Sequence, residues 1–554
     1  MDLNMLFEKF DLLMDSPNST AKMRELILQL AVQGKLVEQD PNHEPAGELL
    51  KRIKAEKEKL ITEGKIKKQK PLAPIDTNDA PYELPNGWVW VRNGALFGLR
   101  KGKKPKNLSE QAIGLPYLNI AALDRDEITK YTDDVKCPQA TDEDILVVCD
   151  GSRSGLLLNG KSGVVGSTLA VIDSPSIIKS YLKILFAKAY QHLNSTMKGA
   201  AIPHLDTKKL LATVIGLPPE AEQKRIVAKV DELMRLCDQL DACQEKASAK
   251  YTSLNDAALE KLLSSKTIDE FAEHWQFICN NFDLIYNDPA HVNKLRQAIL
   301  QLAVQGKLAP QDPNDEPAGE LLKRIKAEKE KLITEGKIKK QKPLPPITED
   351  EIPYELPQKW EWVRFNQLVN PEYPISYGVL VPGPNIEHGI PFVRIGDLNL
   401  INPPLRPEKS IDKEIDRKYE RTRIVGGEIL MGVVGSIGKL GIAPDSWHGA
   451  NIARAICRIV PSKFIYKHYL IWLLQSELMQ NGFIGDTRTL AQPTLNLGLI
   501  RVAFTPLPPL SEQHRIVSKI DQLMHLCDEL ETRLNQSKKD SEMLMQTVLQ
   551  EALN

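Results

Sequence analysis

The chain has 554 residues, of which 42% are hydrophobic and 26% are charged. This length predicts three or four domains at about 100 to 200 residues each, and the composition excludes wholesale disorder. The formal net charge of −1 gives no global sign of a nucleic-acid partner, so any such sign must be local.

The sequence favours a reducing, cytoplasmic location. No stretch approaches about 18 consecutive apolar residues, so no transmembrane helix is predicted. The acidic N-terminal segment MDLNMLFEKFDLLMDS lacks the basic start of a signal peptide. Seven scattered cysteines without a CxxC pair, and histidines without metal-ligand spacing, argue against structural disulfides and zinc.

The chain repeats itself. Residues 24–75 and 296–347 differ at only six of 52 positions, at an offset of 272. Residues 217–241 match 507–531 at an offset of 290. The chain is therefore built twice from a block A (which contains 24–75 or 296–347), a divergent insert and a block B (which contains 217–241 or 507–531). The predicted segments are a helical repeat (1–80), a first insert domain (81–216), a central helical spacer (217–352), a second insert domain (353–506) and a C-terminal helix (507–554).

Block A predicts two helices in each copy. The first carries an apolar stripe, Met23, Ile27, Leu30 and Gly34, which recurs in the second copy at Leu295, Ile299, Leu302 and Gly306. The second helix is charged, starts at residue 46 or 318 and ends near Gly64 or Gly336.

The inserts predict mixed domains rich in short strands. Each begins beside a Trp-x-Trp-Val-Arg strand and contains an apolar strand that ends in Gly-Ser. Each closes with a helix and an x-Pro-x-Leu turn. The predicted elements are strands at 88–92, 114–120 and 145–149, with a helix at about 179–193 and a turn at Pro203 and Leu205; then strands at 360–364, 389–395 and 429–434, with a helix at about 463–479 and a turn at Pro493 and Leu495.

Block B predicts a long helix with an apolar seam of period 3.5, typical of a helix packed along another helix. The seam residues are Ile226, Val230, Leu233, Cys237 and Leu240, and again Ile516, Ile520, Leu523, Cys527, Leu530 and Leu534. We expect the first block B to form an antiparallel coil with the second block A, and the terminal blocks to form an equivalent one. The predicted fold class is α+β, with two insert domains separated by helical spacers in a pseudo-twofold, nearly circular chain. A helix over 220–263 would span roughly 65 Å, about two turns of B-DNA.

The motif LPPxxEQxxIVxKxDxLxxLCDxL, which closes both inserts, resembles the specificity subunit of type I restriction–modification enzymes. The resemblance covers nearly the whole chain, although the long block A helices depart from shorter members. It implies two target-recognition domains that each read half of a bipartite, asymmetric double-stranded DNA target, while the repeated helices set the spacing and dock two methyltransferase subunits. It further implies no catalysis and no cofactor on this chain. S-adenosylmethionine, ATP and Mg²⁺ would belong to the methyltransferase and restriction (translocase) partners.

Local charge agrees with DNA contact by the inserts. Residues 93–216 carry 16 basic against 12 acidic residues, and residues 365–506 carry 15 against 12. The rest of the chain, here called the frame, therefore has a net charge of −8. The predicted phosphate contacts are Arg100, Lys101, Lys103, Lys104 and Lys106, with a plain exposed loop as the alternative. Further candidates, which tight turns or surface ion pairs would equally explain, are Ser152, Arg153, Ser154, Lys161, Arg394, Arg423, Ser436, Lys439, Arg454 and Arg488.

Two segments match the sequence patterns of catalytic motifs. Residues 155–162 fit the phosphate-binding loop GxxxxGK[ST], but the residues that follow read as a strand rather than the required helix. Asn402-Pro-Pro-Leu405 lacks the aromatic residue of the adenine methyltransferase motif and reads as a proline turn. Two rival functions stay open: a nucleotide hydrolase that uses Lys161, and a coiled-coil scaffold with two peptide-binding domains.

Overall fold

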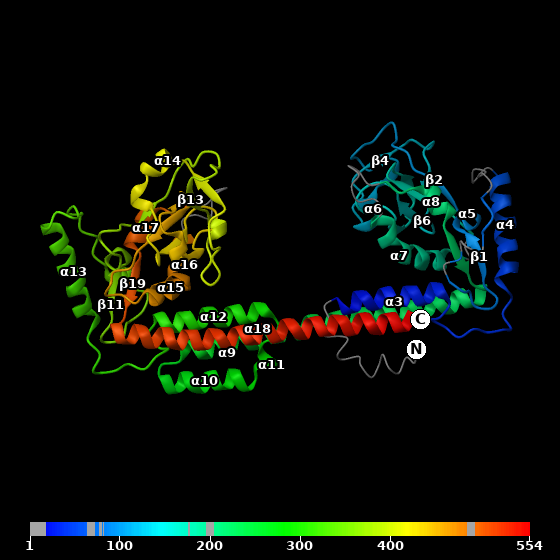
Figure 1. Cartoon of the computed structure of the whole chain (residues 1–554). Helices are drawn as coiled ribbons and strands as arrows, with labels where there is room; N and C mark the ends of the chain where they lie inside the picture. The colour runs from blue at the N-terminus through cyan, green and yellow to red at the C-terminus, as the bar shows by residue number, and fades with distance from the viewer. Residues whose placement is uncertain are drawn as a thin grey trace. The chain divides into compact units, whose positions relative to one another are not determined.

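The computed structural model describes residues 18–63, 72–76, 80, 82–175, 178–195, 204–484 and 494–553. The chain packs into two compact units, whose helices and strands are drawn in Figure 1. Unit 1 is Met1–Lys246 with Lys538–Asn554, and unit 2 is Ala247–Ser537. Each unit holds one insert, and the two long block B helices contribute residues to both units.

The described part of unit 1 begins with two helices, and its insert follows as short strands. The elements are α3 (Ser19–Gln33), α4 (Ala46–Thr62), β1 (Val89–Arg92), α5 (Asn93–Leu96), β2 (Gly98–Lys101), β3 (Leu115–Leu118), α6 (Ile120–Asp124), β4 (Tyr131–Thr132), β5 (Gln139–Ala140), β6 (Ile145–Val148), β7 (Leu157–Asn159), β8 (Gly163–Val165), β9 (Leu169–Asp173), α7 (Lys179–Ser195), α8 (Thr207–Ala212), β10 (Val214–Leu217) and α9 (Glu220–Ser264). One sheet has the order β2-β9-β6-β7 and a second the order β4-β3-β8-β5. The three predicted strands and the closing helix of this insert are confirmed.

Unit 2 repeats this plan. Its elements are α10 (Ile268–Asn280), α11 (Phe282–Ile285), α12 (Pro289–Val304), α13 (Ala318–Thr334), η3 (Glu349–Glu351), β11 (Glu361–Arg364), η4 (Phe365–Gln367), β12 (Ser376–Tyr377), β13 (Ile390–Val393), η5 (Ile395–Asp397), β14 (Lys409–Ile411), α14 (Lys413–Arg417), η6 (Glu420–Thr422), β15 (Ile429–Gly432), β16 (Leu440–Ile442), η7 (Asp445–Trp447), β17 (Asn451–Ile452), β18 (Ile456–Ile459), α15 (Lys467–Gln475), α16 (Glu477–Ile484), α17 (Leu497–Val502), β19 (Phe504–Leu507) and α18 (Leu510–Leu553).

The two inserts share one fold, as predicted. The sheet β12-β18-β15-β16 corresponds to β2-β9-β6-β7, and the parallel pair β13–β17 corresponds to β3–β8. The single helix predicted at about 463–479 is wrong: the chain forms α15 and α16, because Ser476 is buried in an extended conformation between them. Of the predicted turns, Pro203 and Pro493 lie outside the described residues, while Leu205 and Leu495 are buried.

A two-stranded ribbon closes each insert at its neck. β1 pairs antiparallel with β10, and β11 pairs antiparallel with β19, so the Trp-Val-Arg strand lies beside the strand that leads into block B. The Arg92 guanidinium donates to the carbonyls of Ala73, Pro74 and Ala212, and Arg364 donates to those of Pro345, Pro346 and Val502. This shared clamp explains why the arginine and the proline-rich segment recur together.

The Glu-Gln pair of block B ties the repeated segments together. The buried Glu222 and Glu512 carboxylates accept hydrogen bonds from the indole nitrogens of Trp88 at 3.0 Å and Trp360 at 2.9 Å. Gln513 donates to the Pro508 carbonyl at 2.9 Å, as Gln223 does to Pro218 at 3.0 Å. Burial raises the pKa of Glu512 to about 7. Trp88 and Trp360 are therefore core residues.

Within each unit, block A and block B run antiparallel. In unit 1, Arg24 of α3 pairs with Asp238 and Asp241 of α9 at 2.7 and 2.6 Å, and Gln244 Nε2 donates to Ser19. In unit 2, Arg296 of α12 pairs with Asp528 and Glu531 of α18 at 2.6 and 2.8 Å. The predicted seam residues Ile226, Val230 and Cys237 lie buried in the first interface, and Ile516, Ile520, Leu523 and Cys527 in the second.

The pairing predicted between the first block B and the second block A exists, but its direction is wrong. Thr252 contacts His291, Asp256 pairs with Lys294, and the Leu263 carbonyl accepts from Lys307, so α9 and α12 run parallel. The helix α10 carries the chain back between them, as Figure 1 shows. The terminal pair also makes contact, since Leu26 of α3 packs against Met545 and Val548 of α18.

Candidate nucleic-acid interface

The loop after β2 presents three lysines of the first insert. Gly102 lies where an added Cβ would come within 2.2 Å of the Gly166 carbonyl oxygen, so only glycine allows this close approach. The Lys103 amide donates to the Val165 carbonyl at 3.1 Å, which fixes the start of the loop. Lys103, Lys104 and Lys106 are exposed, and among the described residues no partner holds their ammonium groups.

The two cations that precede this loop are held by the fold. Arg100 pairs with Asp173 at 3.0 Å and donates to the Gln139 carbonyl at 2.7 Å. Lys101 lies 3.2 Å from Asp150, which also contacts His204 at 2.7 Å. Burial raises the pKa of Asp150, but hydrogen bonds from His204 and Lys101 outweigh it and lower the pKa overall. Arg100 and Lys101 therefore already have partners, unlike the three lysines.

The turn that follows β6 is equally engaged. Arg153 makes two hydrogen bonds to Asp124, at 2.6 and 2.9 Å. Ser154 is fully buried and its hydroxyl donates to the Gly151 carbonyl at 2.8 Å, so it has no exposed surface to offer a ligand. Ser152 alone of these three is exposed.

The structure gives residues 155–162 no phosphate-binding geometry. They span β7 and the turn into β8, whereas a phosphate-binding loop must open a helix whose amides point at the phosphates. Lys161 pairs with Asp126, and Ser162 donates to Asp142. The predicted strand is confirmed, and the geometry disfavours a nucleotide hydrolase based on Lys161.

In the second insert, most of the predicted cations are paired. Arg394 lies 2.9 Å from Glu408, and Arg423 bonds to Asp416. Lys439 donates to the Ile395 carbonyl at 2.9 Å. Ser436 and Arg454 are exposed, and within the described chain no partner holds the Arg454 guanidinium. Arg488 lies outside the described residues.

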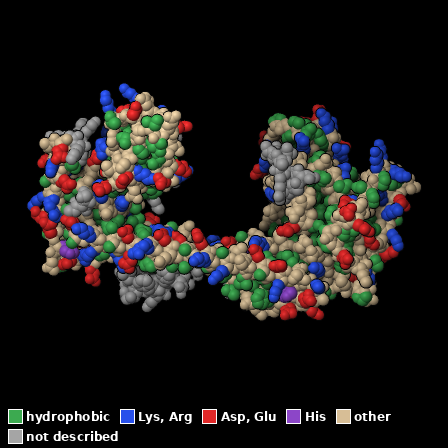
Figure 2. Space-filling model, turned by 180° about the vertical axis from the view of Figure 1, so that it is seen from behind, with side chains coloured by type: hydrophobic (Ala, Val, Ile, Leu, Met, Phe, Trp, Pro, Cys, Tyr) green, Lys and Arg blue, Asp and Glu red, His purple; other side chains and the backbone are tan. Residues whose placement is uncertain are grey.

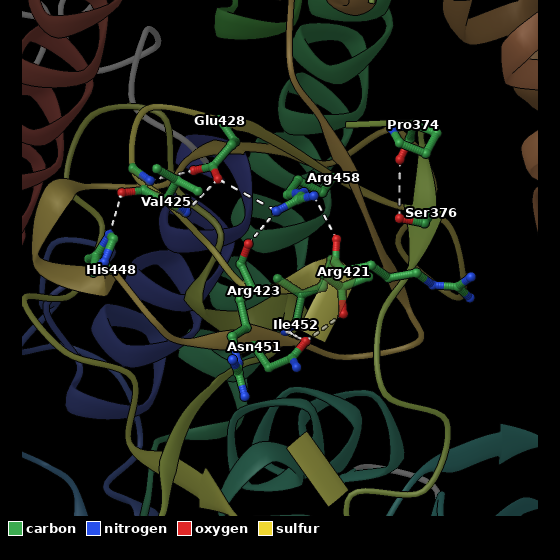
Figure 3. A network of polar contacts seen from close by, with 12 residues as sticks. Pro374, Ser376, Arg421, Arg423, Val425, Glu428, His448, Asn451, Ile452 and Arg458 are labelled. Atoms are coloured by element: carbon green, nitrogen blue, oxygen red, sulfur yellow. Dashed lines mark hydrogen bonds and ion pairs between the residues drawn. The ribbon is translucent and has the colours of Figure 1, made fainter. Parts of the chain in front are cut away.

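A buried polar network, shown in Figure 3, supports the segment 413–423. Arg458 is only 3% exposed; it donates to the carbonyls of Arg421, at 2.6 Å, and Arg423, and lies 3.9 Å from Glu428. Asp416, 1% exposed, accepts from Asn451 at 2.8 Å as well as from Arg423. Inward-facing charges thus fix the backbone of this segment.

The outer side of this segment carries cations that the sequence analysis missed. Lys413, Arg417, Lys418 and Arg421, here called the α14 basic surface, are all exposed, and no described residue pairs with their side chains. In Figure 3, the Arg421 side chain points away from the network. Counting charges hides this surface, because Asp412, Glu414, Asp416 and Glu420 offset the lysines and arginines in the count, although Asp416 lies inside the domain and Glu420 pairs with Arg423. The i, i+4 spacing of Lys413 and Arg417 is a signal that could have found it.

Other parts of the described chain offer less to a ligand. On the face shown in Figure 2, basic and acidic side chains are mixed over the helices. Within the described ranges, no group of three His, Cys, Asp or Glu side chains could hold a metal ion. None of the described helices combines the length and the apolar character needed to cross a membrane.

Comparisons with known proteins agree with these features. Residues 85–251 and 383–537 match the model of the type I restriction modification DNA specificity domain. The chain is 35% identical to the specificity subunit of the type I restriction enzyme EcoAI of Escherichia coli, over 96% of this chain and 94% of that protein. It is 33% identical to the EcoEI specificity subunit of the same organism, with the same shares covered.

A solved structure, the HsdS subunit from Thermoanaerobacter tengcongensis, aligns with 86% of this chain and 99% of its own, at 19% identity and a TM-score of 0.38. The duplicated sequence match, by contrast, covers most of each insert together with the larger part of the block B helix that follows it. Because of this match and the identity over almost the whole length, the chain belongs to the family of DNA-recognising specificity subunits of type I restriction–modification systems, with two target-recognition domains.

Proposed function

We propose that each insert reads one half of a bipartite, asymmetric DNA target. The observation that carries this proposal is the duplication itself: two near-identical helical frames hold two inserts that share a fold but differ in surface residues. One fold with two surfaces suits two related ligands of different sequence. A two-part DNA site offers such a pair.

The repeated helices would set the distance between the half-sites and dock two copies of one methyltransferase subunit. The contacts that recur in both frames support this role, since the buried Glu-Trp bond and the arginine clamp give the two frames the same internal structure. Two equivalent surfaces suit two copies of one partner.

The chemistry would belong to other subunits. The chain itself would be non-catalytic and would hold no cofactor. The methyltransferase subunits would bring S-adenosylmethionine and flip the target adenine out of the stack. A restriction subunit would bring ATP and Mg²⁺ for translocation and cleavage. Because these partners act on intracellular DNA, the complex would work in the cytoplasm.

Phosphate contacts would come from the exposed cations of each insert. Lys103, Lys104 and Lys106 would serve the first insert, and the α14 basic surface with Arg454 the second, since these side chains are exposed and unpaired within the described chain. Cations already held by carboxylates, such as Arg100, would need to exchange those partners to reach a phosphate.

A methylation map tests the proposal. The chain is co-expressed with the methyltransferase encoded beside it, in a host without adenine methylation, and the modified bases are sequenced. We expect a split motif with an unread gap and one methylated adenine in each half. A short continuous motif, or no modification by a complex shown to assemble, would contradict it. Salt-insensitive binding to DNA would instead favour a peptide-binding scaffold.

A further inference from the structure

The loop 399–406 lies between η5 and β14 in the second insert, and hydrogen bonds hold its backbone near both ends. The Asn399 side chain accepts from the amides of Ile401 at 2.8 Å and Asn402 at 2.9 Å. The Trp447 indole donates to the Pro404 carbonyl at 2.9 Å, and the Ser446 hydroxyl donates to the Leu405 carbonyl at 2.8 Å. These four bonds leave the loop little freedom.

Two further features stiffen this loop. Its two prolines, at 403 and 404, have fixed φ angles, and Pro407, which follows the loop, is buried. The Trp447 ring that supports it is only 1% exposed and packs in a core with Leu398 and Ile424. The loop is thus a rigid support, and a rigid loop loses little conformational entropy when it binds.

The side chains of this loop point to solvent. Ile401 and Leu405 are 84% and 83% exposed, the largest exposed fractions among the large apolar residues of the described chain. Asn402 and Arg406 are exposed as well, and no described residue bonds to their amide or guanidinium group. Residues 401–406 therefore present the Asn402 amide, the Arg406 guanidinium and two branched apolar groups on an ordered backbone.

We propose that this loop is a base-reading element of the second insert. In the major groove, asparagine pairs with adenine, arginine pairs with guanine, and apolar side chains contact the methyl group of thymine. The loop carries all three kinds of group. The inference rests on the proposed function, because it assumes that the second insert lies on DNA.

Charge favours DNA over a protein partner at this loop. The nearest acidic residue along the chain, Glu408, is already engaged by Arg394 at 2.9 Å, so Arg406 leaves the loop positive. The α14 basic surface follows directly after β14 and would contact the phosphates on either side of the bases that the loop reads.

The first insert does not share this element. Only residues 125–130 join α6 to β4, whereas residues 398–408 join the corresponding η5 and β14. The shorter connection, Arg-Asp-Glu-Ile-Thr-Lys, carries charges where the longer one carries Ile401 and Leu405. Two different half-sites require different base-reading elements, and a loop that is present in only one insert would supply such a difference.

The test is a methylation map of the full complex with three variants: Asn402→Ala, Arg406→Ala, and the double variant Ile401→Ser with Leu405→Ser. We expect each to relax discrimination at one or two positions, by about 5- to 150-fold per lost contact. The affected positions should fall only in the half that changes when residues 365–506 are exchanged.

Two controls separate this role from others. Arg417→Gln removes a cation of the α14 basic surface, so it should weaken binding to all sequences alike without relaxing the motif. Ile352→Ser changes an exposed apolar residue of the frame and should leave the motif intact.

Three results would overturn the inference. If the variants methylate the wild-type motif unchanged, the loop reads no bases. If they fail to assemble with the methyltransferase in the absence of DNA, the loop is a protein-docking surface. Both of these leave the proposed function standing, because wild type still gives a split motif. If wild type gives no split motif, the proposed function fails first, and this inference falls with it.

Discussion

The helices α4 and α13 have the same 17-residue sequence but different surroundings. In α4, Lys57 is buried and donates to the carbonyls of Gly94 and Phe97, and burial lowers its pKa to about 8. In α13, the equivalent Lys329 is half-buried and bonds to Gln341 at 3.3 Å. Lys329 lines a cavity of about 720 Å³ between α13, the segment 340–347 and Trp362.

The inserts account for this difference. Gly94 of the short helix α5 supplies a carbonyl that Lys57 binds, and its lack of a side chain lets α5 pack closely on α8, since an added Cβ would lie 3.1 Å from the Leu211 carbonyl oxygen. Asn366 of the 3-10 turn η4 occupies the corresponding place in unit 2 and lines the cavity. The repeated sequence thus determines the helix, and the insert determines what each repeated side chain contacts.

Exchange of the second insert is the strongest way to test this separation of roles. Replacing residues 365–506 with the insert of a relative should change one half of the methylated motif completely and leave the other half and the gap unchanged. The reason is that Arg364 and Pro346 of the clamp remain in the frame, and the clamp binds the insert only through a backbone carbonyl, that of Val502. Sequencing of modified bases checks this, and a change in both halves would refute one insert for each half-site.

Charge reversal in the first insert comes next in size. The double variant Lys103→Glu with Lys104→Glu should weaken binding to every DNA sequence, on the order of 100-fold at low salt, and lower the salt slope by about 2. Neither lysine bonds to another described side chain, so folding should be unaffected. Titrations with specific and unrelated duplexes at several salt concentrations measure both quantities. As a control, Lys51→Gln with Lys54→Gln on the exposed side of α4 should leave them unchanged.

Much of the fold follows from the sequence, because its signals are local. The repeats place the frames, apolar runs before Gly-Ser mark β6 and β15, and the period of 3.5 marks the seams of α9 and α18. The predicted antiparallel direction of α12 relative to α9 is wrong. The true direction depends on α10, which carries the chain back, and heptad spacing does not encode that return.

Less of the interface could be predicted, because it depends on partners that are distant in sequence. Arg100 forms an ion pair with Asp173, Arg153 forms one with Asp124, and Ser154 is buried. A count of charges reveals none of these contacts. The burial of Asp416 likewise removes one carboxylate from the α14 basic surface. Tertiary pairing therefore decides which cations remain available to DNA.

A buried carboxyl tests how alike the two frames are. Burial raises the pKa of Glu512 from 4.5 to about 7, so between these values the native chain keeps a proton that the unfolded chain has lost. Stability should therefore fall as the pH rises from about 5 to about 8, by roughly 3 kcal/mol from this group. Urea unfolding followed by circular dichroism at both pH values measures the loss. The variant Glu512→Gln should remove most of it.

Glu222→Gln is the matched variant in unit 1. Burial also raises the pKa of Glu222, and hydrogen bonds from Gln39 and Trp88 oppose this effect, as those from Trp360 and Gln311 do at Glu512. The charge of Asp315, however, raises the pKa of Glu512 further, and Glu222 has no such carboxylate beside it among the causes of its shift. We expect this variant to reduce the pH dependence less than Glu512→Gln does. An equal reduction would mean that the two frames are electrostatically equivalent at this site.

Lys57 and Lys329 give the smallest expected effect and test the helix comparison directly. Because burial lowers the pKa of Lys57 to about 8, the unfolded chain keeps its proton above that pH while the native chain releases it. Stability should therefore rise by about 2 kcal/mol between about pH 8 and pH 10. Lys57→Met should abolish this rise, whereas Lys329→Met, with the same change in the same helix sequence, should leave it intact. If both variants abolished it, the sequence of the helix, rather than the insert beside it, would set the environment of this lysine.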